Sequence, residues 1–285
     1  LFDKDFMNEV QVFLNVLSHD AENDSDVLAL NAASVAVNIS EMPFPGPVGA
    51  VRVGKIDGQL VINPTIPQLD ESIMTLTVAG TADSITMVEG GARHLPEAEI
   101  LEALQFAHGF IIKICALQDE IIKAVGKPKL TVVKKVISPE LEAEVKKRFA
   151  ARIHEGNKIQ DKEGRENAVS EVKKAALAEL AESFPGMEGD IKKIIGSIEK
   201  KDLREAILTE GRRADGRGVR DIRPITCEIG VLPRTHGSAI FTRGQTQALV
   251  VATLGTAADE QKMDNLEGES WKSYLLHYNF PSYSV

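Results

Sequence analysis

Apolar residues recur at helical spacing through the middle of the chain, although this part is strongly charged. Of the 80 residues from 131 to 210, 32 are charged, and the apolar ones fall three or four positions apart. Ser138-Pro139 is typical of a helix start, and Pro185-Gly186 of a break. The pattern predicts a small all-helical domain at residues 129–210, with a core of Leu141, Val145, Phe149, Ile153, Val172, Leu177, Leu180, Phe184, Ile191, Ile194 and Ile198.

Residues 1–128 combine helical and alternating periodicity. Alternation predicts one separate strand and two hairpins, at 10–17, 48–55 with 60–63, and 74–80 with 85–89. One helix is expected to run from an N-cap at Asp24 or Ser25 to about Ser40, and a longer one over 96–125, before Gly126. Strand pairs that alternate with helices indicate a sheet with helices packed on it.

Residues 211–285 return to β character. Four strands are expected, at 225–232, 238–241, 248–254 and 273–280. The second and third are joined at Arg243-Gly244, and the polar tips of Arg234, His236 and Arg243 are spaced to project from this otherwise apolar hairpin. Three groups that carry or can carry positive charge on a rigid hairpin would suit a polyanion.

Charge is distributed unevenly along the 285 residues. The net charge of −9 by itself argues against a nucleic-acid-binding protein. However, residues 1–130 hold 8 basic and 18 acidic side chains, 131–210 hold 16 of each, and 211–285 hold 9 and 8. The excess acid therefore lies in the first segment, whereas seven arginines lie between Arg212 and Arg243. A polyanion would meet that local field more than the average one.

Composition limits the cellular setting. Cys115 and Cys227 offer neither a disulfide framework nor a metal-ligand cluster, and we expect buried free thiols in a reducing compartment. No uninterrupted apolar run reaches the roughly 18 residues of a membrane helix, so no membrane association is expected. Because the chain starts at Leu1 without a signal-peptide pattern, we expect a shortened chain. Trp271 and Tyr274 are expected to pack in a core instead of stacking on bases.

Several motifs carry a family resemblance. The stretch LPRTHGSAIFTRG at 232–244 resembles the opening of the second catalytic domain of the polynucleotide phosphorylase family. GRRADGR at 211–217 resembles the entry to that domain, and LLHYNFP at 275–281 resembles a strand further inside it. FMNEVQV at 6–12 and PFPGPVGAVRVG at 43–54 are similar to the later half of the first catalytic domain. Matches in this order span nearly all of the chain.

The resemblance implies an α+β architecture. Two RNase PH-like sheet domains of the ribosomal protein S5 domain 2-like type, both incomplete, would be joined by a helical domain. The expected boundaries are 1–128 for the C-terminal part of the first domain, 129–210 for the helical linker and 211–285 for the N-terminal part of the second. The resemblance thus places a helical domain at residues 129–210, where the apolar spacing also predicts one.

The resemblance also implies an activity. The family degrades RNA from its 3′ end with inorganic phosphate as co-substrate, releases nucleoside diphosphates in mRNA turnover, and can run backwards as a template-independent polymerase. It implies magnesium, an RNA substrate, a homotrimeric ring, an RNA-degradation complex as a further partner, and a bacterial cytoplasmic or organellar location. The alternative is a non-catalytic RNA-binding or ring-scaffold subunit of an exosome-like assembly.

No catalytic residue and no metal ligand is carried over, because the family's serine-rich phosphate loop, arginine pair and acidic magnesium set belong downstream of the strand ending near Phe280. We therefore expect this chain to be inactive by itself. Weaker candidates for RNA or phosphate binding are Arg243, His236, Arg234 and Arg217. The competing interpretations are an arginine paired with a carboxylate for Arg243, a histidine hydrogen-bonded to backbone for His236, and a solvated turn around Arg217.

Overall fold

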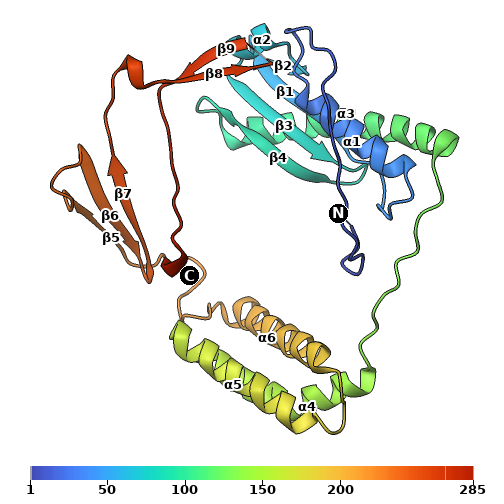
Figure 1. The fold of residues 1–285 in the computed structure, drawn as a ribbon, viewed down its shortest axis with the longest axis vertical. Coiled ribbons are helices and arrows are strands. Elements are labelled where there is room, and N and C mark those ends of the chain that lie inside the picture. Colours follow the sequence, from blue (N-terminus) through green and yellow to red (C-terminus); the bar gives the residue numbers. More distant parts are fainter. Residues whose placement is uncertain (1, 267, 285) are drawn as a thin grey trace. The chain divides into compact units, whose positions relative to one another are not determined.

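The structure is a computed structural model that describes residues 2–266 and 268–284 (Figure 1). The chain divides into two compact units, Leu1–Lys134 with Gly255–Val285, and Lys135–Leu254. Helices and strands occur in both units, so the predicted mixed α+β class is confirmed.

The first unit is built on a four-stranded antiparallel sheet of order β2-β1-β3-β4. Its strands are β1 (Gly49–Ile56), β2 (Gln59–Ile62), β3 (Met74–Gly80) and β4 (Ile85–Ala92). Asp57 and Gly58, both with positive φ, form the turn between β1 and β2. Both hairpins expected in this part of the sequence are therefore confirmed.

One helix covers one face of this sheet, and a second helix packs against β1. The side chains of Val51, Val53, Leu76 and Val78 form a core with α3 (Glu97–Val125), whose Ala103, Ala107, Ile111 and Cys115 are buried. The opposite face presents Ala50 and Ala79 to Val27 of α1 (Asp26–Ile39). A short helix, α2 (Ile66–Glu71), joins β2 to β3. A Cβ at Gly49 would lie 3.0 Å from the carbonyl oxygen of Ile111, so glycine lets α3 approach β1 closely.

The long helix α3 has the length and mean hydropathy of a membrane-spanning helix. Glu102 and Lys113 interrupt its apolar run, and its small residues pack against the sheet. Core packing therefore accounts for the apolar character of the α3 face that contains Ala103, Ala107, Ile111 and Cys115.

The second unit begins with a three-helix bundle of α4 (Pro139–Asn157), α5 (Lys162–Leu180) and α6 (Glu188–Glu210). Ser138 caps α4 by accepting from the backbone N–H of Leu141, and Asp161 caps α5 by accepting from that of Gly164 at 2.7 Å. Eight of the eleven predicted core residues are buried, and Leu177, Phe184 and Ile198 pack against them. The helical pattern therefore predicted this core correctly.

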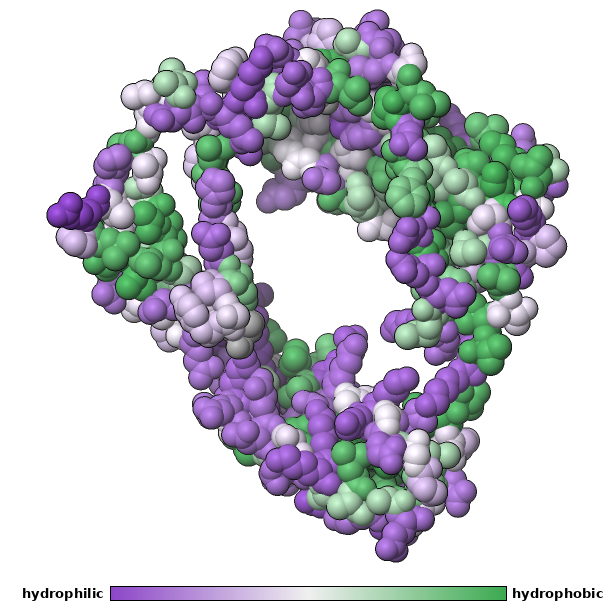
Figure 2. Space-filling model, in the orientation of Figure 1, coloured by the Kyte–Doolittle hydropathy of each residue, from purple (hydrophilic) through white to green (hydrophobic). Residues whose placement is uncertain are grey.

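A three-stranded antiparallel sheet of order β5-β6-β7 completes the second unit. Its strands are β5 (Ile225–Ile229), β6 (Gly237–Arg243) and β7 (Thr246–Ala252), in the three regions where strands were expected. Gly244, at a φ of 60°, forms the predicted turn between β6 and β7. Ile229, Leu249 and Val250 are more than half exposed, and Figure 2 shows hydrophobic atoms gathered over this sheet.

Four expectations are wrong: two strands, the packing of two aromatic residues, and the burial of one cysteine. Residues 10–17 and 273–280 form no strand, because neither segment pairs with another strand among the described residues. A hairpin of β8 (Gln261–Asn265) and β9 (Gly268–Lys272) was not predicted. Trp271 and Tyr274 are exposed instead of packed, and Cys227 is exposed, whereas Cys115 is buried as expected.

Candidate functional site

Arg243 lies at the turn between β6 and β7. It is the last residue of β6, and the backbone N–H of the following Gly244 donates to the carbonyl of Pro224 at 3.0 Å. The guanidinium is exposed and pairs with no carboxylate of the described chain, contrary to the interpretation that such a carboxylate would neutralise it. The turn that carries Arg243 is thus held by a backbone hydrogen bond, and its guanidinium, unpaired among the described residues, is free to contact a phosphate.

Arg234 and His236 lie at the other end of the same strand. The backbone N–H of Leu254, just beyond β7, donates to Nδ1 of His236 at 2.8 Å. The expectation of a histidine hydrogen-bonded to backbone is confirmed, and because Nδ1 accepts, the ring proton is on Nε2. Arg234 is exposed, and the structure gives it no carboxylate partner among the residues described.

The strand separates these candidates. Between Arg234 and Arg243 runs the seven-residue strand β6. At about 3.3 Å per residue, such a strand holds its two ends roughly 20 Å apart. The hairpin therefore presents two separate cationic points instead of one convergent site, and a ligand that meets both must be extended.

Arg217 organises its own loop. Its Nε donates to Oδ2 of Asp215 at 2.9 Å and its Nη1 to the carbonyl of Asp221 at 2.8 Å, and its side chain is only 20% exposed. The hydrogen bond from Arg217, followed by its backbone N–H and the nearby charge of Arg223, holds the pKa of Asp215 below its usual range against partial burial. The interpretation of this loop as a turn with its charges in solvent is therefore wrong for Arg217.

Arg165 of α5 connects this loop to the bundle. Its Nη1 donates to the carbonyls of Ile159 at 3.1 Å, Gln160 at 3.3 Å and Ala214 at 3.2 Å. The loop that contains Arg217 thus has a defined position on the end of α5.

Magnesium, which the family resemblance implies, finds no binding set here. Within residues 2–266 and 268–284, no three His, Cys, Asp or Glu side chains converge as a metal site requires. The acidic residues Asp20, Asp24 and Asp26 have other roles: Asp20 accepts from the backbone of Glu22 and Asn23, and the other two pair with Arg52.

Comparison with protein-family models gives three matches along the chain. Residues 46–109 match the 3′ exoribonuclease family, domain 2, and residues 221–285 match domain 1 of the same family. Between them, residues 140–218 match the model described as "Polyribonucleotide nucleotidyltransferase, RNA binding domain". The order, with a second domain before a first one and a helical domain between, is the order that the sequence motifs indicate.

Curated relatives match over the entire chain. The polyribonucleotide nucleotidyltransferases of Syntrophotalea carbinolica and Heliobacterium modesticaldum are both 46% identical over 285 residues, and that of Geobacter sulfurreducens is 44% identical. The chain belongs to the polyribonucleotide nucleotidyltransferase family. The matches cover all of this chain but only 40–41% of the length of each of these relatives. The chain therefore corresponds to a part of a family member.

Membership of the polyribonucleotide nucleotidyltransferase family places the elements described above. The four-stranded sheet with α1 and α3 contains the match to domain 2, the bundle α4–α6 lies in the match to the helical model, and β5 to β9 lie in the match to domain 1. Three of the four candidate residues, Arg234, His236 and Arg243, are in the domain 1 match, whereas Arg217 is at the end of the helical one.

Proposed function

We propose that this chain is a part of a phosphorolytic 3′-to-5′ exoribonuclease, which releases nucleoside diphosphates from RNA in mRNA turnover and can run in reverse as a template-independent polymerase. The proposal rests on the three segments that match family models in the expected order. It also rests on 43–46% identity to polyribonucleotide nucleotidyltransferases over all 285 residues. A shared fold alone would be weaker support, because one fold hosts many functions.

The chemistry assigns different tasks to different parts of the protein. Phosphorolysis needs a fixed phosphate nucleophile, stabilisation of charge at the scissile phosphodiester, and an RNA 3′ end held in line. Inorganic phosphate is the co-substrate, and magnesium is the cofactor that the family implies. Among the described residues, no three metal-ligating side chains converge, and we propose that the 285-residue chain is inactive by itself.

The candidate residues then have supporting roles. Arg243 and Arg234, both exposed and unpaired within the described chain, guide and contact RNA phosphates at the two ends of β6. His236 offers its Nε2–H to a phosphate oxygen while its Nδ1 stays on the backbone of Leu254. Arg217 positions the loop before β5 through Asp215 and does not contact RNA directly.

We further propose domain boundaries at 128/129 and 210/211, a homotrimeric ring that encloses RNA, association with an RNA-degradation complex, and a bacterial cytoplasmic or organellar location without membrane attachment. The bacterial relatives support the bacterial alternative.

The test uses a full-length family member that contains this sequence. Given RNA, inorganic phosphate and magnesium, it should release nucleoside diphosphates, and without phosphate it should not. The 285-residue chain assayed alongside should release none. If the full-length protein binds RNA but yields no nucleoside diphosphates, the alternative of a non-catalytic RNA-binding or ring-scaffold subunit replaces the proposal.

A further inference from the structure

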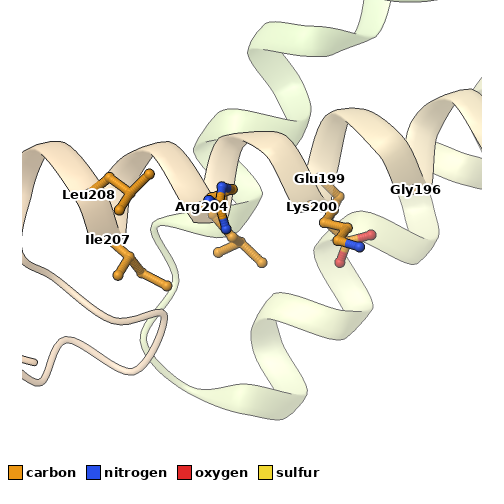
Figure 3. Close-up of a pocket in the computed structure, with 7 residues that line it drawn as sticks. Gly196, Glu199, Lys200, Arg204, Ile207 and Leu208 are labelled. Carbon is orange, nitrogen blue, oxygen red and sulfur yellow. The ribbon is translucent and has the colours of Figure 1, made fainter. Parts of the chain in front are cut away.

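The C-terminal half of α6, drawn in Figure 3, leads into a loop at residues 211–224. Gly216, at a φ of 83°, forms a turn in this loop, and its backbone N–H donates to the carbonyl of Arg213 at 2.9 Å. Arg165 of α5 donates to the carbonyl of Ala214 at 3.2 Å. The loop is therefore docked on the helical bundle before the chain enters β5.

Asp215 is shared by two arginines of this loop. Its Oδ2 accepts from Nε of Arg217 at 2.9 Å and lies 3.6 Å from Nε of Arg223. The side chains of Asp215 and Arg223 are 31% and 45% exposed, so an isolated pair between them would be weak. Because the same carboxylate also holds Arg217, the three charges form a network, which fixes side chains more firmly than a single surface pair.

The residues that follow this network contact the turn between β6 and β7. A Cβ at Gly244 would lie 3.2 Å from Cδ of Arg223, so the aliphatic part of this arginine lies directly against the glycine. The backbone N–H of Gly244 donates to the carbonyl of Pro224 at 3.0 Å. Ile225, the first residue of β5, pairs in register with Arg243. Three consecutive residues thus support the turn that carries Arg243.

We propose that Asp215 is a positioning residue for Arg243; this inference rests on the proposed function, in which Arg243 contacts an RNA phosphate. Asp215 orients the guanidinium of Arg223, and the aliphatic part of Arg223 supports the turn at Gly244. Because Arg165 docks the loop on α5, the position of Arg243 also depends on the helical bundle. A cation held in place binds a phosphate at a lower entropic cost than one on an unsupported turn.

The test measures binding of a short labelled single-stranded RNA to the 285-residue chain by fluorescence anisotropy. Loss of a negative charge by itself should strengthen the binding of a polyanion. Asp215→Asn should instead weaken it by about two- to fivefold, the range expected for a partly exposed ion-pair network. The control Glu171→Gln removes an acid that pairs with Lys174 within α5, and it should bind at least as tightly as the parent chain.

A double-mutant cycle separates positioning from a general loss of stability. Arg243→Gln should weaken binding and make the slope of log affinity against log salt shallower by about 0.7, the value for one phosphate contact on a single strand. In the Asp215→Asn background the same substitution should weaken binding less, because Arg243 has already lost its defined position. A merely destabilising Asp215→Asn would leave the effect of Arg243→Gln unchanged. Circular dichroism checks that each variant is folded.

Amide hydrogen exchange at Gly244, followed by NMR, reports the state of the turn without RNA. In Asp215→Asn this amide should exchange about two- to fivefold faster than in the parent chain, because the network no longer supports the turn. In the control Glu171→Gln it should exchange as in the parent chain.

Four outcomes would overturn the positioning role: RNA binding by Asp215→Asn that equals or exceeds that of the parent chain, additive effects in the cycle, unchanged exchange at Gly244, or no RNA binding by the parent chain. Each of these leaves the proposed phosphorolysis standing, because that is measured separately as nucleoside diphosphate release by the full-length protein.

Discussion

The backbone N–H of Leu254 donates to Nδ1 of His236 at 2.8 Å, which joins the chain just after β7 to the start of β6. The two residues are 18 positions apart, and the bond fixes both the ring orientation and the ring nitrogen that carries the proton. His236 therefore has a structural role that any contact with RNA must leave intact.

The variant His236→Asn should preserve this bond, because the amide oxygen can take the place of Nδ1, whereas His236→Ala should lose it. Amide hydrogen exchange at Leu254, followed by NMR, should be roughly two- to tenfold faster in the alanine variant, as expected for one net hydrogen bond. The asparagine variant should exchange like the parent chain. Identical exchange in all three proteins would contradict the role given to His236.

A buried polar network connects α1, the start of β1 and α3. Ser34 Oγ donates to Oε1 of Gln118 at 2.7 Å and accepts from the backbone N–H of Val48 at 2.9 Å. Ser34→Ala leaves these two buried groups without a partner and should lower the free energy of unfolding by about 1–3 kcal/mol. Urea unfolding followed by circular dichroism measures this. Thr209→Ala, at an exposed position on α6, should change the value by less than about 0.5 kcal/mol. An equal effect of both substitutions would show that the network does not stabilise the fold.

Stability should fall in acid through Asp24. Burial alone would raise the pKa of Asp24, but hydrogen bonds from Arg52 and from the backbone N–H of Asp26 outweigh it and hold this pKa below the ordinary value of 3.8. A carboxyl with a lowered folded-state pKa stabilises the fold above 3.8 and loses that contribution as the pH falls through its folded-state pKa. Asp24→Asn should thus be less stable than the parent at pH 7, and the difference should shrink towards pH 2 when urea unfolding is compared. A constant difference across this range would refute the linkage.

Two glycines should respond to alanine in opposite directions. Gly196→Ala places a methyl group in open space within a helix and should stabilise the chain by about 0.5–1 kcal/mol. Gly90, in β4, has a φ of 153°, and its Cβ would lie 1.9 Å from the carbonyl oxygen of Thr75, so Gly90→Ala should destabilise. Thermal unfolding of both variants measures the signs. Destabilisation by Gly196→Ala would mean that the helix requires glycine for an internal reason.

Local pattern predicted elements whose partners are close in sequence. Both hairpins of the first sheet, the bundle core around Phe149 and Ile153, and the turn at Gly244 follow from periodicity and turn chemistry. Residues 10–17 and 273–280 alternate equally well but form no strand, since a strand also needs a partner to satisfy its backbone groups. The hairpin of β8 and β9 was missed because most of its residues are polar and exposed on both faces, so it lacks the alternation of a half-buried strand.

The candidate site was predictable as a set of residue types but not as a geometry. Sequence motifs indicated Arg234, His236 and Arg243, and only the register of β6 shows that they lie at two ends of a strand. The spacing of the α6 cations opposite Ile191 and Ile195 is visible in the sequence, but which of them lack an ion-pair partner among the described residues is not. The signal becomes informative only when ion pairs are known, because a charged helix face by itself is ordinarily solvated.

The sequence by itself determined the family, the α+β class and the helical domain between two sheets, because motifs, periodicity and turn residues are local properties of the chain. The tertiary structure decided which charges are paired and which are free: it pairs Arg217 with Asp215, leaves Arg243 and Lys200 without a partner among the described residues, and holds His236 on the backbone of Leu254. These outcomes depend on distances between residues that are separated in sequence, and electrostatic and hydrogen-bond energies change steeply with such distances.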